Sequence, residues 1–184
     1  MLIVACNEQL PVSEARAGDP DAWNALLKRY QLPLYIYARK MVQNEQTSLD
    51  IVQETFINAT RHIGKLLEDS KFGSWLFSIA HQKCIQHWRN QRPDQAFDEI
   101  ENDAGFAVED DPHELLVRKE QEEQFMRSLN ELAKPHRAVL LLHFVEDFSL
   151  EEISTITGTP LGTVKSRLHY ARKSLKKILE ENDQ

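Results

Sequence analysis

The chain of 184 residues carries 22 Lys and Arg against 29 Asp and Glu, and 41% of its residues are hydrophobic. That hydrophobic fraction excludes a wholly disordered chain, and the length suits one domain or two small ones. Its two cysteines, Cys6 and Cys84, show no CxxC spacing, which is typical of a reducing compartment rather than of a disulfide framework. The opening "MLIVAC" is too short for a signal-peptide core, and no apolar run approaches the length of a membrane span. We therefore expect a cytoplasmic protein without membrane insertion.

The excess acidity lies in one short stretch, residues 94–114. This stretch holds nine Asp and Glu and no Lys or Arg, whereas residues 1–93 have a net charge of +2 and residues 115–184 of 0. It contains a Gly and a Pro and has little apolar periodicity. We interpret it as a flexible acidic linker between two modules, 1–93 and 115–184. The alternative is a surface loop inside one domain.

Three helices are predicted before this stretch. The first begins at Asp19-Pro20, an N-cap followed by Pro, and Pro33 is expected to bend or locally break it. The second spans about 48–67, with Ile51, Val52, Thr55, Phe56 and Ala59 on its buried side. The third spans about 73–89, and its apolar residues are spread around the circumference. It should therefore pack on more than one side or offer aromatic residues to a partner.

Helical signals continue in residues 115–184. A helix should bury Leu115, Leu116, Phe125, Leu129 and Leu132, and Pro135 opens another. No alternating strand pattern occurs, so the sequence predicts an all-α fold of two helical modules.

A helix-turn-helix is predicted near the C-terminus. The segment from Ser149 to Glu152 reads as a capping box, and Gly158 supplies the left-handed residue that ends the short helix. Thr159 can cap the next helix, with Pro160 at its first position. Two helices joined by such a tight turn form a helix-turn-helix.

The second helix of this pair has an apolar stripe and a polar outer face with basic shoulders. Such a face suits the major groove of DNA, where outer side chains reach base edges and shoulder cations meet phosphates. The alternatives are a solvated amphipathic helix and a helix that binds a partner protein. The stripe comprises Leu161, Val164, Leu168, Ala171, Leu175 and Ile178, at spacings of 3 and 4.

The segment "FSLEEISTITGTPLGTVKSRLHYARKSLKKIL" closely resembles region 4 of bacterial sigma factors, especially the extracytoplasmic-function group. The segments "SLDIVQETFINATRHIGKL" and "FGSWLFSIAHQKCIQHWRNQRP" resemble region 2. The two resemblances stand in the family's order and cover most of the chain. They imply a factor that binds core RNA polymerase and confers promoter specificity, with a probable anti-sigma factor as a further partner.

The resemblance also implies three sets of site residues. Asp50, Gln53 and Glu54 match the segment that docks on the polymerase, and at i, i+3 and i+4 they share one helix face. Lys71, Phe72, Gln82, Arg89 and Arg92 would contact the single-stranded -10 element. The residues expected at the -35 element are Pro160, Gly162, Thr163, Lys165, Ser166, Arg167, His169, Tyr170, Arg172 and Lys173.

No catalytic chemistry is evident in the sequence. His81, Cys84 and His87 resemble part of a metal site, but the third residue rotates away from the face of the first and no fourth ligand is evident. We expect no metal, no cofactor and no enzymatic activity. A stand-alone helix-turn-helix regulator with an N-terminal sensor or dimerisation domain remains the alternative function, and a small all-α enzyme or scaffold is the other.

Overall fold

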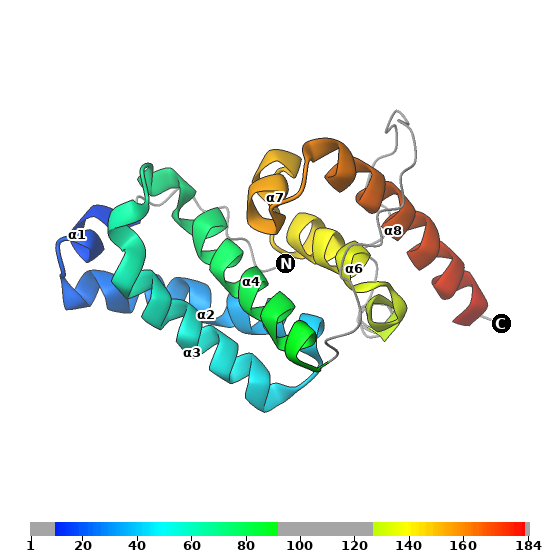
Figure 1. The fold of residues 1–184 in the computed structure, drawn as a ribbon, viewed down its shortest axis with the longest axis horizontal. Coiled ribbons are helices and arrows are strands. Elements are labelled where there is room, and N and C mark those ends of the chain that lie inside the picture. The colour runs from blue at the N-terminus through cyan, green and yellow to red at the C-terminus, as the bar shows by residue number, and fades with distance from the viewer. Residues whose placement is uncertain (1–9, 92–126, 183–184) are drawn as a thin grey trace.

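The computed structural model describes residues 10–91 and 127–182, and every regular element in these two ranges is helical (Figure 1). In the described part of the chain, no helix is both long and apolar enough to cross a membrane. The N-terminal module consists of α1 (Val12–Arg16), α2 (Pro20–Val42), α3 (Glu45–His62) and α4 (Phe72–Gln91), with 3-10 turns η1 (Ile63–Lys65) and η2 (Asp69–Lys71) before α4. The C-terminal module consists of η4 (Leu129–Glu131), α6 (Lys134–Leu140), the π-helical turn η5 (Leu141–Val145), α7 (Leu150–Thr157) and α8 (Leu161–Asn182).

Some predictions fall outside the described residues. These are the acidic linker 94–114 and the inward positions Leu115, Leu116 and Phe125 of the helix expected after it. Leu129 and Leu132, the last two inward positions of that helix, are buried as predicted.

Local capping signals explain where the first long helices begin. The Asp19 carboxylate accepts a hydrogen bond from the N–H of Asp21 at 2.9 Å and caps α2, as predicted. The Asn44 side chain caps α3 from the N–H of Thr47, so α3 begins three residues before the predicted start at Ser48. The predicted break at Pro33 is wrong, because α2 runs through it without interruption.

The core of the N-terminal module is formed by α2, α3 and α4, which pack against one another. Tyr30 of α2 lies against Phe72, with ring centroids 5.5 Å apart, and Tyr37 lies edge-on to Phe77 at 5.6 Å. Since α4 also packs against α7, it is buried on more than one side, as its scattered apolar residues predicted. Of these, Leu76, Phe77 and Trp88 are buried and Ile79 and Ile85 are half-buried.

The helix-turn-helix forms as its sequence signals predicted. The Ser149 hydroxyl accepts a hydrogen bond from the N–H of Glu152, whose carboxylate accepts one from the N–H of Ser149. Gly158 ends α7 with φ of 65°. The chain then enters α8, whose first half packs on α6 and α7.

The two modules are in contact. Helices α6 and α7 lie between α4 and α8 (Figure 1), and α7 packs directly on α4. The N-terminal end of α8 is therefore near α4, while its C-terminal end projects away from the N-terminal module.

Candidate nucleic-acid interface

Helix α8 presents one buried and one exposed face. Val164, Leu168, Ala171 and Leu175 of the predicted stripe are buried, and Leu161 and Ile178 at its ends are half-buried. On the opposite face Gly162, Lys165, His169 and Lys173 are exposed, with Thr163, Ser166 and Tyr170 half-buried beside them. The face that carries cations and hydrogen-bonding side chains is thus available to a ligand.

The cations on the sides of α8 have different surroundings. The Arg172 guanidinium lies 5.0 Å from the centroid of the Phe144 ring in its own module. Arg167 points toward α4, where it lines a cavity of about 160 Å³ with His81, Gln82 and Arg89. Lys165 and Lys173 are exposed. Sequence reasoning placed Arg167 and Arg172 on opposite shoulders but could not distinguish their neighbours.

The turn before α8 differs by one residue from the prediction. Helix α8 begins at Leu161, and Pro160 precedes it, with its carbonyl accepting the N–H of Val164 at 3.0 Å. The Thr159 hydroxyl shares a hydrogen bond with that of Thr157 at 2.8 Å, and the Thr159 carbonyl accepts one from Ser154. These bonds tie the turn to α7, so the entry angle of α8 depends on both helices.

The predicted -10 residues are only partly brought together. Lys71, Gln82 and Arg89 are exposed, and Gln82 and Arg89 line one groove between α3 and α4. Phe72 is fully buried against Tyr30, so the expectation that it contacts an extruded base is wrong. Arg92 lies outside the described residues.

The groove between α3 and α4 contains residues that sequence reasoning missed. It has a volume of about 650 Å³, and its walls carry polar side chains together with the half-exposed indole of Trp75. We had assigned Trp75 to the core, because an aromatic residue at helical spacing is more often buried. The signal that could have found the groove is the polar face that α3 turns toward α4. Its further polar lining is Asn58, His62, Lys65, Ser78, Lys83, Gln86 and Asn90.

The third set lies on the exposed face of α3. Asp50, Gln53 and Glu54 are all exposed, which leaves them available to one partner surface. Glu54 forms an ion pair with Lys83 of α4, and Asp50 accepts a hydrogen bond from the Gln46 amide at 3.1 Å. Leu49 is 48% exposed beside them. An exposed Leu next to acceptors suits a protein partner better than a nucleic acid.

His81, Cys84 and His87 do not converge. His81 is buried and hydrogen-bonded to the Tyr37 hydroxyl at 2.7 Å, whereas His87 bonds to Gln91. Burial raises the pKa of the Cys84 thiol to about 12, which keeps it protonated. No cluster of three or more metal-ligating side chains occurs in the described ranges.

Two family models match the chain, one over each module. The model of Sigma-70 region 2 matches residues 26–93, and that of Sigma-70 region 4 matches residues 122–175. Each match contains the elements that carry the candidate residues described above.

Curated relatives resemble the chain over nearly its whole length. The RNA polymerase sigma-H factor of Pseudomonas aeruginosa is 32% identical over 189 residues, covering 98% of this chain and 97% of the relative. The ECF RNA polymerase sigma factor SigW of Bacillus subtilis is 29% identical over 178 residues, covering 92% and 95%. The ECF RNA polymerase sigma-E factor of Escherichia coli is 31% identical, covering 91% and 92%.

Solved structures share the fold. CnrH, in complex with the cytosolic domain of CnrY, matches with a TM-score of 0.67 and 23% identity, over 92% of this chain and 95% of that one. The sigma factor RpoE of Bartonella quintana, in complex with the anti-sigma factor NepR, matches with a TM-score of 0.63 and 23% identity. That match covers 84% of this chain and 96% of the other.

Proposed function

Since the chain belongs to the sigma-70 family, in its extracytoplasmic-function group, we propose that its two modules divide promoter recognition between them. As a member of this family it directs transcription initiation by RNA polymerase. In the proposal α8 reads the duplex -35 element, α4 and its groove hold the single-stranded -10 element, and α3 docks on the core enzyme. A sigma factor acts where polymerase and chromosome are, so we place the protein in the cytoplasm, without a cofactor or enzymatic activity of its own.

The observation that carries the proposal is the exposed face of α8. The capping box and the Gly158 turn orient this helix, and its apolar stripe anchors it on α6 and α7. The side chains left outside are His169, with Tyr170 beside it, and the cations Lys165 and Lys173. Hydrogen-bonding groups flanked by cations match the base edges and phosphates of a major groove.

The groove between α3 and α4 supports the -10 assignment. Single-stranded DNA needs cations along its backbone and apolar or aromatic surfaces for unstacked bases. The groove offers Arg89, Lys65 and Lys83 as cations, Trp75 as a stacking surface and Gln82 as a hydrogen-bonding group. In this proposal Trp75 replaces the buried Phe72 as the aromatic contact.

The acidic and apolar face of α3 supports the polymerase assignment. Asp50 and Glu54 place two carboxylates beside the exposed Leu49, and their negative charge disfavours DNA at this surface. We also propose that an anti-sigma factor binds this chain, as the printed description of the RpoE complex states for that relative.

The division of the chain at 93/94 and 114/115 is part of the proposal. The two family matches support it, because they leave residues 94–121 between them. The acidity of residues 94–114 would keep that segment away from DNA while the modules bind.

Promoter-specific run-off transcription with purified core polymerase tests the proposal. The chain should start transcripts at defined promoters that the core enzyme alone ignores. In a promoter library, His169→Ala should change the preferred -35 sequences, at about 1–3 kcal/mol per lost base contact. The exposed residue Glu151 of α7 supplies a matched control, since Glu151→Ala should keep the parental preference. Binding of duplex DNA as a dimer, without any stimulation of core polymerase, would instead support the stand-alone regulator.

A further inference from the structure

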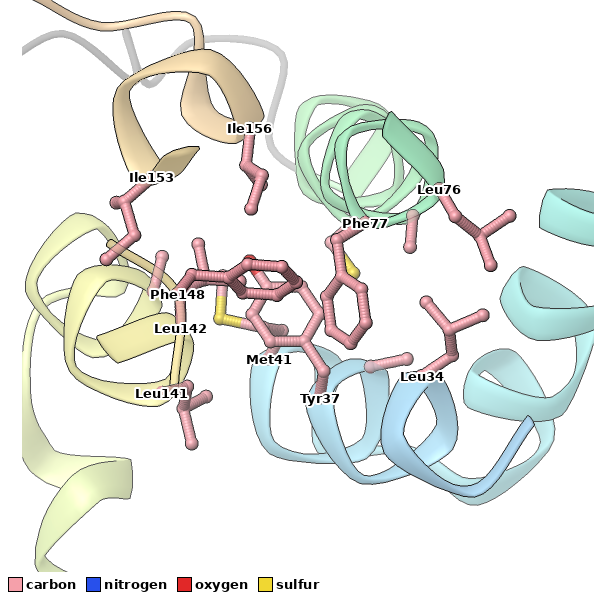
Figure 2. Packing of buried hydrophobic residues seen from close by; sticks show 14 of the residues in the cluster. Leu34, Tyr37, Met41, Leu76, Phe77, Leu141, Leu142, Phe148, Ile153 and Ile156 are labelled. Atoms are coloured by element: carbon pink, nitrogen blue, oxygen red, sulfur yellow. The ribbon is translucent and has the colours of Figure 1, made fainter. Parts of the chain in front are cut away.

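The contact between the modules is an apolar core shared by both. The Phe148 ring, just before α7, lies edge-on to Phe77 of α4, with centroids 5.0 Å apart. Both side chains are buried, with at most 6% of their surface exposed. In Figure 2 the residues Ile153, Ile156 and Phe148 face Tyr37, Met41 and Phe77 across this contact.

Polar contacts bound the apolar core. The Arg137 guanidinium of α6 donates a hydrogen bond to the Lys40 carbonyl of α2 at 3.0 Å, while its other nitrogen bonds within the C-terminal module. The Lys134 ammonium lies 4.5 Å from the centroid of the Trp88 ring of α4. Contacts of three kinds therefore join the modules.

This docked arrangement brings residues assigned to both promoter elements into one place. Arg167 of the -35 set lines the same 160 Å³ cavity as Gln82 and Arg89 of the -10 set. The two elements are about 25 base pairs apart by their names, or about 85 Å along a duplex at ~3.4 Å per pair. Helix α8 itself is only about 33 Å long at ~1.5 Å per residue, so its far end cannot span the difference.

We propose that the docked arrangement is a resting state of the free protein, in which the α7–α4 contact prevents the two modules from engaging both promoter elements at once. The proposal rests on the function proposed above. Separation of the modules is then a required step in assembly with polymerase and promoter. Its free-energy cost lowers the apparent affinity for core polymerase by the fraction of molecules that are open.

Glu146 makes this contact sensitive to protons. It is 2% exposed, and neither carboxylate oxygen has a hydrogen-bond partner in the described structure. Burial raises its pKa to about 8, so that the docked state holds a protonated carboxyl that would ionise in water. The other titratable or charged groups at this junction are Tyr37 of α2, His81 and Cys84 of α4, Arg137 of α6 and Arg167 of α8.

Small-angle scattering of the full chain, without polymerase or DNA, tests docking independently of the proposed function. The wild type should have a radius of gyration near the ~16 Å of a compact chain of this length. Phe148→Ser should increase that radius while keeping the helical circular-dichroism signal, and should lower the apparent Kd for core polymerase several-fold. Phe144→Ser is the matched control, because Phe144 lies in the same segment but contacts Arg172 of its own module. An extended wild type, or a Phe148→Ser chain as compact as the wild type, would overturn the proposal.

A second variant avoids any damage to the apolar core. Glu146→Gln keeps the shape of the protonated side chain but cannot ionise. Between pH 7 and pH 9 the docking equilibrium of the wild type should weaken about tenfold, because the carboxyl has its pKa near 8 only when docked. The apparent Kd of the wild type for core polymerase, relative to that of Glu146→Gln, should fall by up to that factor. An unchanged ratio over this range would also contradict the resting state.

Discussion

The Tyr37 hydroxyl lies 2.7 Å from Nδ1 of His81, which places a hydrogen bond between α2 and α4 beneath the docked C-terminal module. Burial lowers the pKa of His81 to about 4, and the charge of Arg167 lowers it further in the same direction. Burial also raises the pKa of Tyr37 well above its usual value. At neutral pH both groups are therefore uncharged, and His81 supports α4 rather than binding a phosphate.

His81 and Glu146 should oppose each other in the dependence of stability on pH. The unfolded chain binds a proton at His81 below pH 6.5 and the folded chain only below about 4, so acidification over that range lowers the free energy of unfolding. Glu146 has a folded pKa of about 8 and an ordinary value of 4.5, so acidification between these values raises it. Glu146→Gln removes the second effect. Between pH 6.5 and 5 it should therefore lose about 2 kcal/mol relative to the wild type, at ~1.36 kcal/mol per pH unit.

Urea unfolding at the two pH values measures this difference. Equal pH slopes for the wild type and the variant would show that Glu146 is ionised in the folded state.

Gly158 should be needed for its backbone conformation alone. Its φ is 65°, and a Cβ placed there would meet nothing within 4 Å. Gly158→Ala should therefore destabilise the chain by about 1–2 kcal/mol, the cost of a left-handed residue with a side chain. Gly64 also has open space around it but no such φ, so Gly64→Ala should change thermal stability far less. Equal effects of the two substitutions would contradict this account of the turn.

Arg172 and Lys173 should differ although they are adjacent and equally charged. Lys173→Ala should weaken all -35 sequences alike and reduce the salt slope of binding by about one unit, because an exposed cation meets phosphate only. Arg172→Ala should in addition lower stability by about 0.5–1 kcal/mol, because its guanidinium stacks on Phe144 in the protein itself. Chemical denaturation together with DNA binding at several salt concentrations separates the two effects. The distinction is lost if both variants have wild-type stability.

Charge reversal on α3 should affect polymerase binding selectively. Asp50→Lys and Glu54→Lys, each alone, should reduce co-purification with core polymerase while leaving -35 binding by the full chain unchanged. Glu14→Lys, at an exposed position of α1, is the matched charge control. Stability should change by no more than ~1 kcal/mol even where the Glu54–Lys83 ion pair is lost, because Glu54 is largely exposed. Normal co-purification of both variants would remove Asp50 and Glu54 from the proposed docking surface.

Limited proteolysis of the full chain should cut first between Asp94 and Glu114 and leave two resistant fragments. The prediction depends on the nine acidic residues of this stretch and on its lack of apolar periodicity. Mass spectrometry of the early fragments locates the cuts. A single protected fragment that spans residues 94–114 would move the boundary.

Local chemistry allowed much of the fold to be predicted. The caps at Asp19 and Ser149, the left-handed Gly158 and the stripe of α8 were all confirmed, because each depends on residues no more than a few positions apart. The family resemblance was confirmed for the same kind of reason, since its motifs are short and local.

Other features were decided by packing between distant segments. Pro33 does not break α2, since Tyr30 and Leu34 on either side of it are buried in one core. Phe72 is buried rather than available to DNA because Tyr30, 42 positions earlier, covers it, and Trp75 reaches the groove only because α3 lies opposite. The docking of α7 on α4, which brings Arg167 to Gln82 and Arg89, likewise joins segments far apart in the chain. Periodicity tells which face of a helix is apolar, but the three-dimensional arrangement alone decides what covers that face.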